Sequence, residues 1–450
     1  MFHRILIANR GEIALRIVRA CRELGVESVC VYSEADKDAS YLRLCDRAIC
    51  IGPPAAKDSY LNIARIIAAA EIADVDAIHP GYGFLSERAE FAQACADCKI
   101  EFIGPTPAAM ARLGDKVACK NAAKEAGVPI FPGSPGAIED PEEAAQVAAT
   151  IGYPVIIKAA AGGGGRGMRV CRDEAALRSN LQAASTEALA AFGNGAVFIE
   201  KYLEHAQHIE IQVLGDKFGN AIHLWERNCS VQRRHQKLIE EAPSPGVSRE
   251  KIAPVCAAAV RLIQQAKYHG AATVEFLMDN KQDFYMLEVN TRVQVEHPVT
   301  EAITGVDIVQ TMIRVAAGEK LPYRQEDITV RGHALECRIN AEDPSRNFMP
   351  QPGPVTRWEV PGGPGVRLDT HVVPGYVVPK FYDSMVAKLI VHADDRLQCL
   401  DRALRALREF AIEPLKTTVP LHQRVLGSKE FRDGGVDIHW LERVTPLLSY

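Results

Sequence analysis

The sequence predicts a mixed α/β protein built from two or three domains. Its 450 residues exceed what one hydrophobic core normally supports. Strand-length apolar runs alternate with helical stripes in the N-terminal part, a pattern typical of a parallel sheet with helices on its faces. Beyond about residue 114 the pattern changes to short strands with Pro- and Gly-rich loops, which indicates that a new domain begins there.

A β-α-β unit opens the chain. Residues 4–9 are expected to form an apolar strand, residues 9–12 a turn, and residues 28–33 the next strand. Between the strands, apolar residues recur at helical spacing, at Ile13, Ile17, Ala20, Cys21 and Leu24. Because no GxGxxG motif follows the first strand, we interpret the unit as a Rossmann-like structural layer and not as a dinucleotide site.

The rest of the chain divides into three stretches. Residues 115–127 are expected to form a helix, and short strands follow to about residue 203. A second α/β block runs to about residue 320. From residue 331 onward the sequence predicts short strands, turns and an amphipathic helix over residues 397–410.

Composition is that of an ordinary globular protein. Apolar residues make up 47% and charged residues 24%, and the net charge of −5 gives no indication of nucleic-acid or membrane-surface binding. No apolar run approaches the roughly 20 residues that span a bilayer, and the N-terminus does not resemble a signal peptide. We therefore expect a cytoplasmic protein, or one inside an organelle after loss of a transit peptide. The 12 cysteines are expected to be mostly reduced and structural.

A lysine followed by glycines marks one candidate ligand site. Residues 154–158 are predicted to form a buried strand ending at Lys158, and five of the six residues from 162 to 167 are glycine. The backbone N–H groups of such a loop can fold over phosphate oxygens. The motif GxxxxGK[ST] is absent, so this is not a P-loop. A mobile surface loop without a ligand is the alternative, and the adjacent lysine favours phosphate contact.

Two further strands carry weaker indications. The strand at residues 197–203 can offer its backbone to an adenine edge, but so can any strand end. In the strand at residues 208–213, His208, Glu210 and Gln212 share one face. A ligand-binding face and a solvated face fit this alternation equally well.

Residues 288–296 are the most informative segment, because every second residue is polar. In an extended chain one row would hold Glu288, Asn290, Arg292, Gln294 and Glu296. Upstream, a strand over residues 273–278 carries Glu275, and turn residues at 279–282 predict a hairpin that brings Glu275 beside Glu288.

This row suits a magnesium site. The carboxylates of Glu275 and Glu288 and the amide oxygen of Asn290 are hard ligands for Mg²⁺, which would bridge ATP phosphates. An amphipathic edge strand with ordinary charges is the alternative, but facing carboxylates without a compensating cation are unfavourable. The sequence therefore favours a metal site.

The polar residues beyond Asn290 suit an anionic substrate. Arg292 offers a planar fork to an oxyanion, Gln294 can hydrogen-bond a substrate, and Glu296 can act as a base. The basic run at residues 232–237 fits phosphate or oxyanion handling better than nucleic acid, because it is short and acidic residues follow it; a solvated loop is the alternative. Arg338, in the segment 336–344, would by itself be interpreted as a structural ion-pair partner.

Together these segments resemble biotin carboxylase, the ATP-grasp component of acetyl-CoA carboxylase and related enzymes. The resemblance covers nearly the whole chain. It rests on IANRGEIA at residues 7–14, HPGYGFLSE at 79–87, the glycine loop, RRHQK at 233–237, and residues 288–298 and 336–344. It implies a Rossmann-like N-terminal domain at 1–114, an ATP-grasp domain at 115–330 with a mobile lid at about 131–203, and an α+β C-terminal domain at 331–450.

The resemblance also implies a role for individual residues. The ATP site would be lined by Lys116, Lys158, Glu200, Lys201, Leu203, His208, Gln232 and His235, with Gly164 and Gly165 in its lid and with Glu275 and Glu288 beside the phosphates. Mg²⁺, or Mn²⁺ in its place, would be held by Glu275, Glu288 and Asn290. Bicarbonate would be bound by Lys237, Arg292, Gln294 and Val295. Glu296 would deprotonate bicarbonate, and Arg338 would bind biotin and stabilise its enolate.

The implied reaction is the carboxylation of biotin by MgATP and bicarbonate through carboxyphosphate. The chain has no Met-Lys-Met attachment motif, so biotin is expected on a separate carrier protein, with separate carboxyltransferase subunits and a homodimeric enzyme. The sequence departs from the usual family pattern at Tyr41, Cys45 and Lys380, away from the implied catalytic positions.

Alternatives to this reaction stay open. They are an ATP-grasp ligase that makes carbamoyl phosphate or joins a carboxylate to an amine, and a nucleotide-sensing module without turnover. Within the family, the final acceptor can be acetyl-CoA, another acyl-CoA or pyruvate, and the length of the chain favours the acetyl-CoA system of fatty-acid synthesis.

Overall fold

The computed structural model describes residues 1–138, 140–159 and 168–447. The chain forms two compact units. The large unit comprises Met1–Val128, Gln207–Leu277 and Glu288–Tyr450, and the small unit comprises Pro129–Ala206 and Met278–Leu287. Among the described residues, no helix combines the length and apolarity needed to cross a bilayer.

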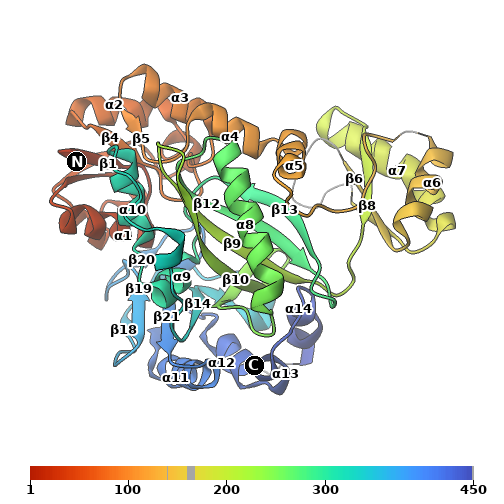
Figure 1. Cartoon of the computed structure of the whole chain (residues 1–450). Helices are drawn as coiled ribbons and strands as arrows, with labels where there is room; N and C mark the ends of the chain where they lie inside the picture. The colour runs from red at the N-terminus through yellow and green to blue at the C-terminus, as the bar shows by residue number, and fades with distance from the viewer. Residues whose placement is uncertain (139, 160–167, 448–450) are drawn as a thin grey trace. The chain divides into compact units, whose positions relative to one another are not determined.

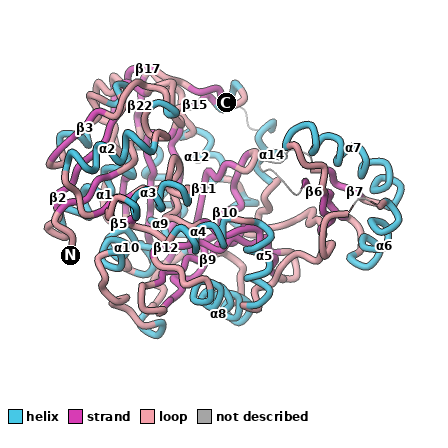
Figure 2. The backbone as a smooth tube through the Cα atoms, turned by 90° about the horizontal axis from the view of Figure 1, so that it is seen from above, coloured by secondary structure: helices cyan, strands magenta, loops and turns pink. Residues whose placement is uncertain are grey.

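The large unit begins with the parallel sheet that the sequence predicts. Its five strands lie in the order β3-β2-β1-β4-β5 and all pair in parallel. They are β1 (Arg4–Ile7), β2 (Glu27–Tyr32), β3 (Arg47–Cys50), β4 (Ala77–His79) and β5 (Glu101–Phe102). Helix α1 (Gly11–Glu23) packs on Ile5 and Ile7, whereas α2 (Ile63–Ala73) and α3 (Ala89–Asp97) pack on Leu6. Both faces of β1 are therefore buried, and the Rossmann-like layer is confirmed. Figure 2 shows α1, α2 and α3 beside the strands of this layer.

An eight-stranded sheet forms the rest of the large unit, with an edge strand that runs into the small unit. Its order is β13-β12-β9-β10-β11-β14-β21-β19. The strands are β9 (Gln207–Gly215), β10 (Ala221–Arg233), β11 (Gln236–Ala242), β12 (Gly270–Met278), β13 (Phe284–Asn290), β14 (His333–Asn340), β19 (Val366–Asp369) and β21 (Met385–Ala393). Since β14 pairs with β11, the strands of the second α/β block and of the C-terminal stretch form one continuous sheet.

Helices cover this sheet. Helix α8 (Arg249–Gln265) crosses β9 and β10 (Figure 1), and α11 (Arg396–Glu409), close to the predicted range 397–410, packs with α12 (Val419–Gly427) against β14 and β21. The other helices of this unit are α4 (Pro107–Gly114), α5 (Lys116–Glu125), α9 (His297–Thr304), α10 (Ile308–Ala316), α13 (Lys429–Asp433) and α14 (Trp440–Val444). The short strand pairs are β15 (Glu342–Asp343) with β16 (Met349–Pro350), β17 (Gly353–Pro354) with β20 (Val377–Val378), and β18 (Arg357–Glu359) with β22 (Ala411–Glu413).

The small unit is a three-stranded antiparallel sheet covered by two helices. The strands β6 (Val155–Ala159), β7 (Arg169–Cys171) and β8 (Val197–Lys201) lie in the order β7-β6-β8. Helices α6 (Pro141–Ile151) and α7 (Glu174–Phe192) pack on the sheet through a core that includes Val155, Ile157 and Leu181. The predicted glycine loop, with Gly164 and Gly165, lies outside the described residues.

Candidate active site

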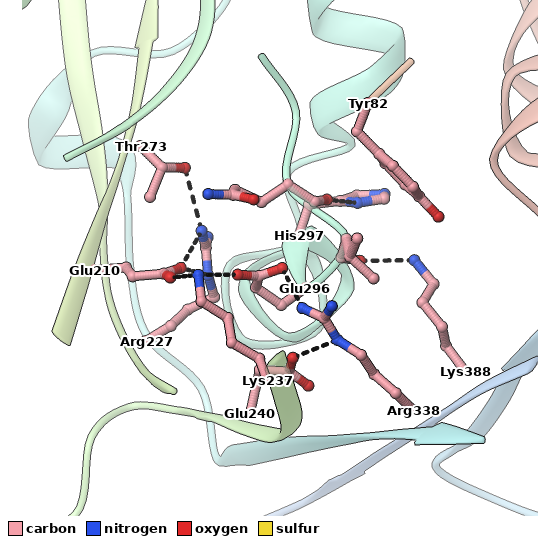
Figure 3. Close-up of polar contacts among 12 residues, drawn as sticks. Tyr82, Glu210, Arg227, Lys237, Glu240, Thr273, Glu296, His297, Arg338 and Lys388 are labelled. Atoms are coloured by element: carbon pink, nitrogen blue, oxygen red, sulfur yellow. Dashed lines mark hydrogen bonds and ion pairs between the residues drawn. The ribbon is translucent and has the colours of Figure 1, made fainter. Parts of the chain in front are cut away.

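Lys237 on β11 is the centre of a buried ionic cluster in the large unit. Its Nζ contacts the carboxylate of Glu210 and lies 2.9 Å from Glu275 Oε1 and 2.9 Å from Glu296 Oε1. Burial alone would lower the pKa of Lys237, but the three carboxylates raise it well above its usual value. Lys237 therefore stays charged and joins acidic side chains from three different segments; Figure 3 shows it between Glu210 and Glu296.

A β-bulge explains how β11 directs Lys237 into this cluster. The pairing of β10 with β11 is irregular next to Val231, where β11 carries Leu238 as an extra residue. An extra residue reverses the alternation of side chains along a strand. Lys237 and Glu240, three positions apart, therefore come to the same side of the sheet.

Glu296 is fully buried between two cations. Besides its contact with Lys237, its Oε2 accepts a hydrogen bond from Arg338 Nη2 at 2.8 Å. Burial raises the pKa of Glu296, but the charges of Lys237, Arg338 and Arg227 lower it well below its usual value. Glu296 is therefore a carboxylate at neutral pH.

Arg338 on β14 bridges two buried carboxylates. Its Nε donates to Glu240 Oε1 at 2.6 Å while its Nη2 holds Glu296. Burial raises the pKa of Glu240 to about 7, against the lowering effect of Arg338. The ion-pair role expected for Arg338 is confirmed, and its partners place it in the cluster around Lys237.

The predicted extended row over residues 288–296 is wrong beyond Asn290. Strand β13 ends at Asn290, the chain turns, and α9 begins at His297, whose N–H donates to Gln294 O at 3.3 Å. Alternating polarity is expected for a strand, but a turn that directs its polar side chains to one side gives the same pattern. The buried Val293 is compatible with either conformation.

The polar side chains of the turn nevertheless converge. Arg292 donates from Nη1 to Gln294 Oε1 at 2.6 Å and from Nη2 to Asn290 Oδ1 at 3.0 Å. Its Nε donates to Glu87 Oε2 at 2.8 Å. Gln294 Nε2 in turn donates to Glu275 Oε1 at 3.0 Å, which links the turn to the contacts of Lys237.

The donor set predicted for Mg²⁺ lies at the hairpin of β12 and β13. The two strands are neighbours, as the turn at residues 279–282 predicts, and Asn290 Nδ2 donates to Glu275 Oε1 at 2.8 Å. Glu288 is exposed, yet partial loss of hydration and the negative charges of Glu275 and Glu87 raise the pKa of its carboxyl group. Oxygen donors whose negative charges repel one another fit a divalent cation.

His208, Glu210 and Gln212 share one face of β9, and that face is buried. His208 Nε2 lies 3.1 Å from Glu275 Oε2, and the fully buried Arg227 contacts both Glu210 and Gln212. The solvated alternative for this strand is therefore wrong.

The small unit holds four of the residues expected to line the ATP site. Lys158 Nζ lies 2.8 Å from Glu200 Oε2 across β6 and β8. Lys201 Nζ donates to the carbonyl oxygens of Gly152 and Tyr153 at 2.9 and 3.0 Å. Leu203 follows β8 as a half-buried residue.

Other expected ATP-site residues belong to the large unit. Lys116 is exposed at the start of α5. Gln232 is buried and pairs with Lys237 across β10 and β11. His235 is exposed in the two-residue turn of that hairpin, where it and Arg234 have positive φ.

Besides Glu210, which the sequence left between a ligand-binding and a solvated face, three residues were not identified as site residues from the sequence. Glu87 lies within a segment that carries the family resemblance, which could have marked it. No local pattern marks Arg227 or Glu240. Arg227 follows Glu226 and Glu240 precedes Glu241, so two charged residues stand side by side in each pair and the sequence does not show which one faces the site. Only strand pairing brings them into the cluster, where Arg227 contacts Glu210 and Glu240 contacts Arg338.

Comparisons with known proteins agree with this architecture along the whole chain. Three family models match: "Biotin carboxylase, N-terminal domain" at residues 1–110, "Carbamoyl-phosphate synthase L chain, ATP binding domain" at 115–324, and "Biotin carboxylase C-terminal domain" at 336–443. The central model alone would also suit a carbamoyl-phosphate enzyme, but the two flanking models are those of biotin carboxylases.

Individual relatives match over nearly their full length. Biotin carboxylase 1 of Bacillus subtilis is 52% identical over 443 residues, covering 98% of both chains. A pyruvate carboxylase subunit from Methanothermobacter thermautotrophicus is 52% identical over 442 residues, covering 98% of this chain and 90% of the relative.

A solved structure gives the same result. The biotin carboxylase domain dimer of Hydrogenobacter thermophilus 2-oxoglutarate carboxylase, in complex with MgADP, ADP and bicarbonate, is 48% identical with a TM-score of 0.92, covering 100% of this chain and 99% of that one. A Rossmann-like domain, an ATP-grasp domain and a matching C-terminal domain are thus combined in one chain, which belongs to the biotin carboxylase family of ATP-grasp ligases.

Proposed function

We propose that this chain uses MgATP and bicarbonate to carboxylate biotin on a separate carrier protein, through carboxyphosphate. The observation that carries this proposal is the buried carboxylate of Glu296, held between Lys237 and Arg338. A base thus lies within hydrogen-bond distance of an ammonium group that can bind an oxyanion and of a guanidinium.

Glu296 would act as the base that deprotonates bicarbonate. Lys237 and Arg338 both favour the charged form of Glu296 and lower its pKa. Glu296 is therefore ionised but weakly basic while both cations hold it. An anion bound by Lys237, Arg292, Gln294 and Val295 would take up the Lys237 ammonium group that now holds Glu296. This contact would loosen and Glu296 would become more basic when substrate is present.

Arg338 would bind biotin and stabilise the negative charge of its enolate. The guanidinium is planar, and its contacts with Glu240 and Glu296 fix its plane. A donor held in place before the charge develops stabilises a transition state without reorganisation.

Glu275, Glu288 and Asn290 would hold Mg²⁺ or Mn²⁺. When bound, the cation would neutralise charge on the ATP phosphates. Asn290 now donates to Glu275 while its oxygen accepts from Arg292, so Asn290 would turn its oxygen toward the cation.

The nucleotide would be bound by the residues that the family resemblance assigns to it. These are Lys116, Lys158, Glu200, Lys201, Leu203, His208, Gln232 and His235, with a lid at about 131–203 that includes Gly164 and Gly165. A lid would keep water away from carboxyphosphate. We assign the domains to residues 1–114, 115–330 and 331–450.

The reaction would be the first half-reaction of acetyl-CoA carboxylase, feeding malonyl-CoA and fatty-acid synthesis. Partners would be a biotin carboxyl carrier protein, carboxyltransferase subunits and a second copy of this chain, in the cytoplasm. The same half-reaction in another acyl-CoA or pyruvate carboxylase is the second candidate, because a pyruvate carboxylase relative is as similar as a biotin carboxylase.

ADP release by the purified chain tests this function. With MgATP, release should require bicarbonate, rise with free biotin, and fall by about 10²–10⁴-fold in Glu296→Gln. Glu241→Gln is the matched control: Glu241 is also buried and ion-paired, but to His333 and Arg396. Release that depends on an amine would indicate another ATP-grasp ligase, and nucleotide binding without turnover would indicate a sensing module.

A further inference from the structure

Lys388 on β21 is a buried lysine that contacts the turn carrying Glu296. Its side chain is fully buried, and its Nζ donates to the carbonyl oxygen of Val295 at 2.7 Å. Figure 3 shows the side chain extended toward this turn, on the side of Glu296 away from Lys237. Nothing in the proposed chemistry requires a second lysine at this place.

Acidic groups from three elements surround this ammonium group. Glu12, at the start of α1, has Oε1 at 3.1 Å from Nζ and also accepts a hydrogen bond from Tyr82. Asp369 on β19 is the direct cross-strand partner of Lys388, and the carboxyl group of Glu336 on β14 lies near enough to contribute to the raised pKa of Lys388. Lys388 therefore stays charged although it is buried, and a charged donor makes a stronger hydrogen bond than a neutral one.

The carbonyl group of Val295 lies between the two site residues of the turn, Gln294 and Glu296. Gln294, just before it, contacts Glu275, and Glu296, just after it, contacts Lys237 and Arg338. Among the described residues, Lys388 is the donor to this carbonyl, because the backbone bonds of the turn go to the oxygens of Gln294 and Glu296. Rotation of this peptide would displace both neighbouring side chains.

We propose that Lys388 is a positioning residue, which fixes the Val295 peptide so that Gln294 faces Glu275 and Glu296 faces Lys237. The proposal rests on the proposed function for its catalytic consequence. A residue of β21 thereby sets the orientation of a base that belongs to the ATP-grasp part of the chain. A role limited to balancing the charge of Glu12 is the competing explanation.

Two substitutions separate these explanations. Lys388→Met removes the donor to Val295 and keeps the length of the side chain. Glu12→Gln removes the carboxyl group of one acidic neighbour but leaves Lys388, its bond to Val295 and the carboxyl groups of Asp369 and Glu336. The double variant Lys388→Met/Glu12→Gln restores folding if Lys388→Met alone is destabilised by an unpaired Glu12.

Hydrogen exchange and steady-state kinetics give the readouts. In Lys388→Met and in the double variant, the peptide covering residues 290–300 should exchange at least about tenfold faster, while α8 is unchanged. The kcat for bicarbonate-dependent ADP release should fall by about 10–100-fold with the KM for ATP within twofold, since a displaced base slows chemistry and not nucleotide binding. Glu12→Gln should leave both readouts near wild type.

Each outcome decides the proposal. Unchanged exchange at residues 290–300 in both Lys388 variants would overturn it, as would a KM for ATP that rises in step with the fall in kcat. Equal effects of Glu12→Gln and Lys388→Met would show that charge balance is the whole role. If the wild-type chain releases no ADP in response to bicarbonate, the proposed function fails, whereas faster exchange of the turn in the variants still supports the positioning role.

Discussion

Replacing Arg338 with methionine tests the ion-pair geometry and the proposed role of this residue together. Arg338 holds Glu240 at 2.6 Å and Glu296 at 2.8 Å, and both carboxylates are fully buried. Removing one partner of a buried ion pair costs at most about 3–5 kcal/mol, and the cost is smaller near neutral pH because Glu240, whose pKa is about 7 even beside Arg338, can take up a proton. Glu296 keeps Lys237 as a partner, so most of this loss should come from Glu240.

A second substitution checks that assignment. Glu240→Gln removes the carboxyl group that Arg338→Met leaves unpaired, so the double variant should regain about 0.5–3 kcal/mol of the lost free energy of unfolding. Urea unfolding of the two single variants and the double variant measures this coupling directly.

The activity of the same variants tests the role of Arg338 toward biotin. Loss of one preorganised donor to a developing oxyanion lowers kcat by about 10²–10³-fold. The biotin-dependent part of ADP release should fall by this factor in Arg338→Met, and the bicarbonate-dependent release without biotin should fall less. Equal loss of both activities, or a double variant no more stable than Arg338→Met, would refute the reasoning.

Two further predictions concern the metal and the pH. Glu288→Gln should raise the Mg²⁺ concentration for half-maximal ADP release by at least about tenfold, with Glu241→Gln as control; an unchanged requirement would remove Glu288 from the metal site. Burial raises the pKa of Glu301, but Arg16, His297 and Arg367 lower it to about 2, so ionised Glu301 should stabilise the fold by about 3 kcal/mol above pH 4.5. The free energies of unfolding of wild type and Glu301→Gln should therefore differ by the full amount at pH 7, and the difference should shrink as the pH falls toward 2. A difference that is constant with pH would contradict this assignment.

Much of the fold follows from local patterns in the chain. The alternation of apolar strands and helical stripes predicts the parallel sheet, and the turn residues between Glu275 and Glu288 predict the hairpin of β12 and β13. Both predictions succeed because short-range periodicity and turn chemistry determine these elements. The same periodicity marks the segment 288–296 as a site segment, but it wrongly predicts an extended backbone beyond Asn290.

The sequence by itself determined which residue types can handle phosphate, a divalent cation and an oxyanion, and which segments carry them. Only the tertiary structure decided how they meet. The bulge at Leu238 turns Lys237 toward Glu296, the end of β13 at Asn290 lets the chain fold back, and the pairing of β11 with β14 brings Arg338 beside Glu240. Lys388 reaches Val295 from a strand 93 residues away in sequence. These contacts depend on strand register and on long-range packing, which a pattern of neighbouring residues does not encode.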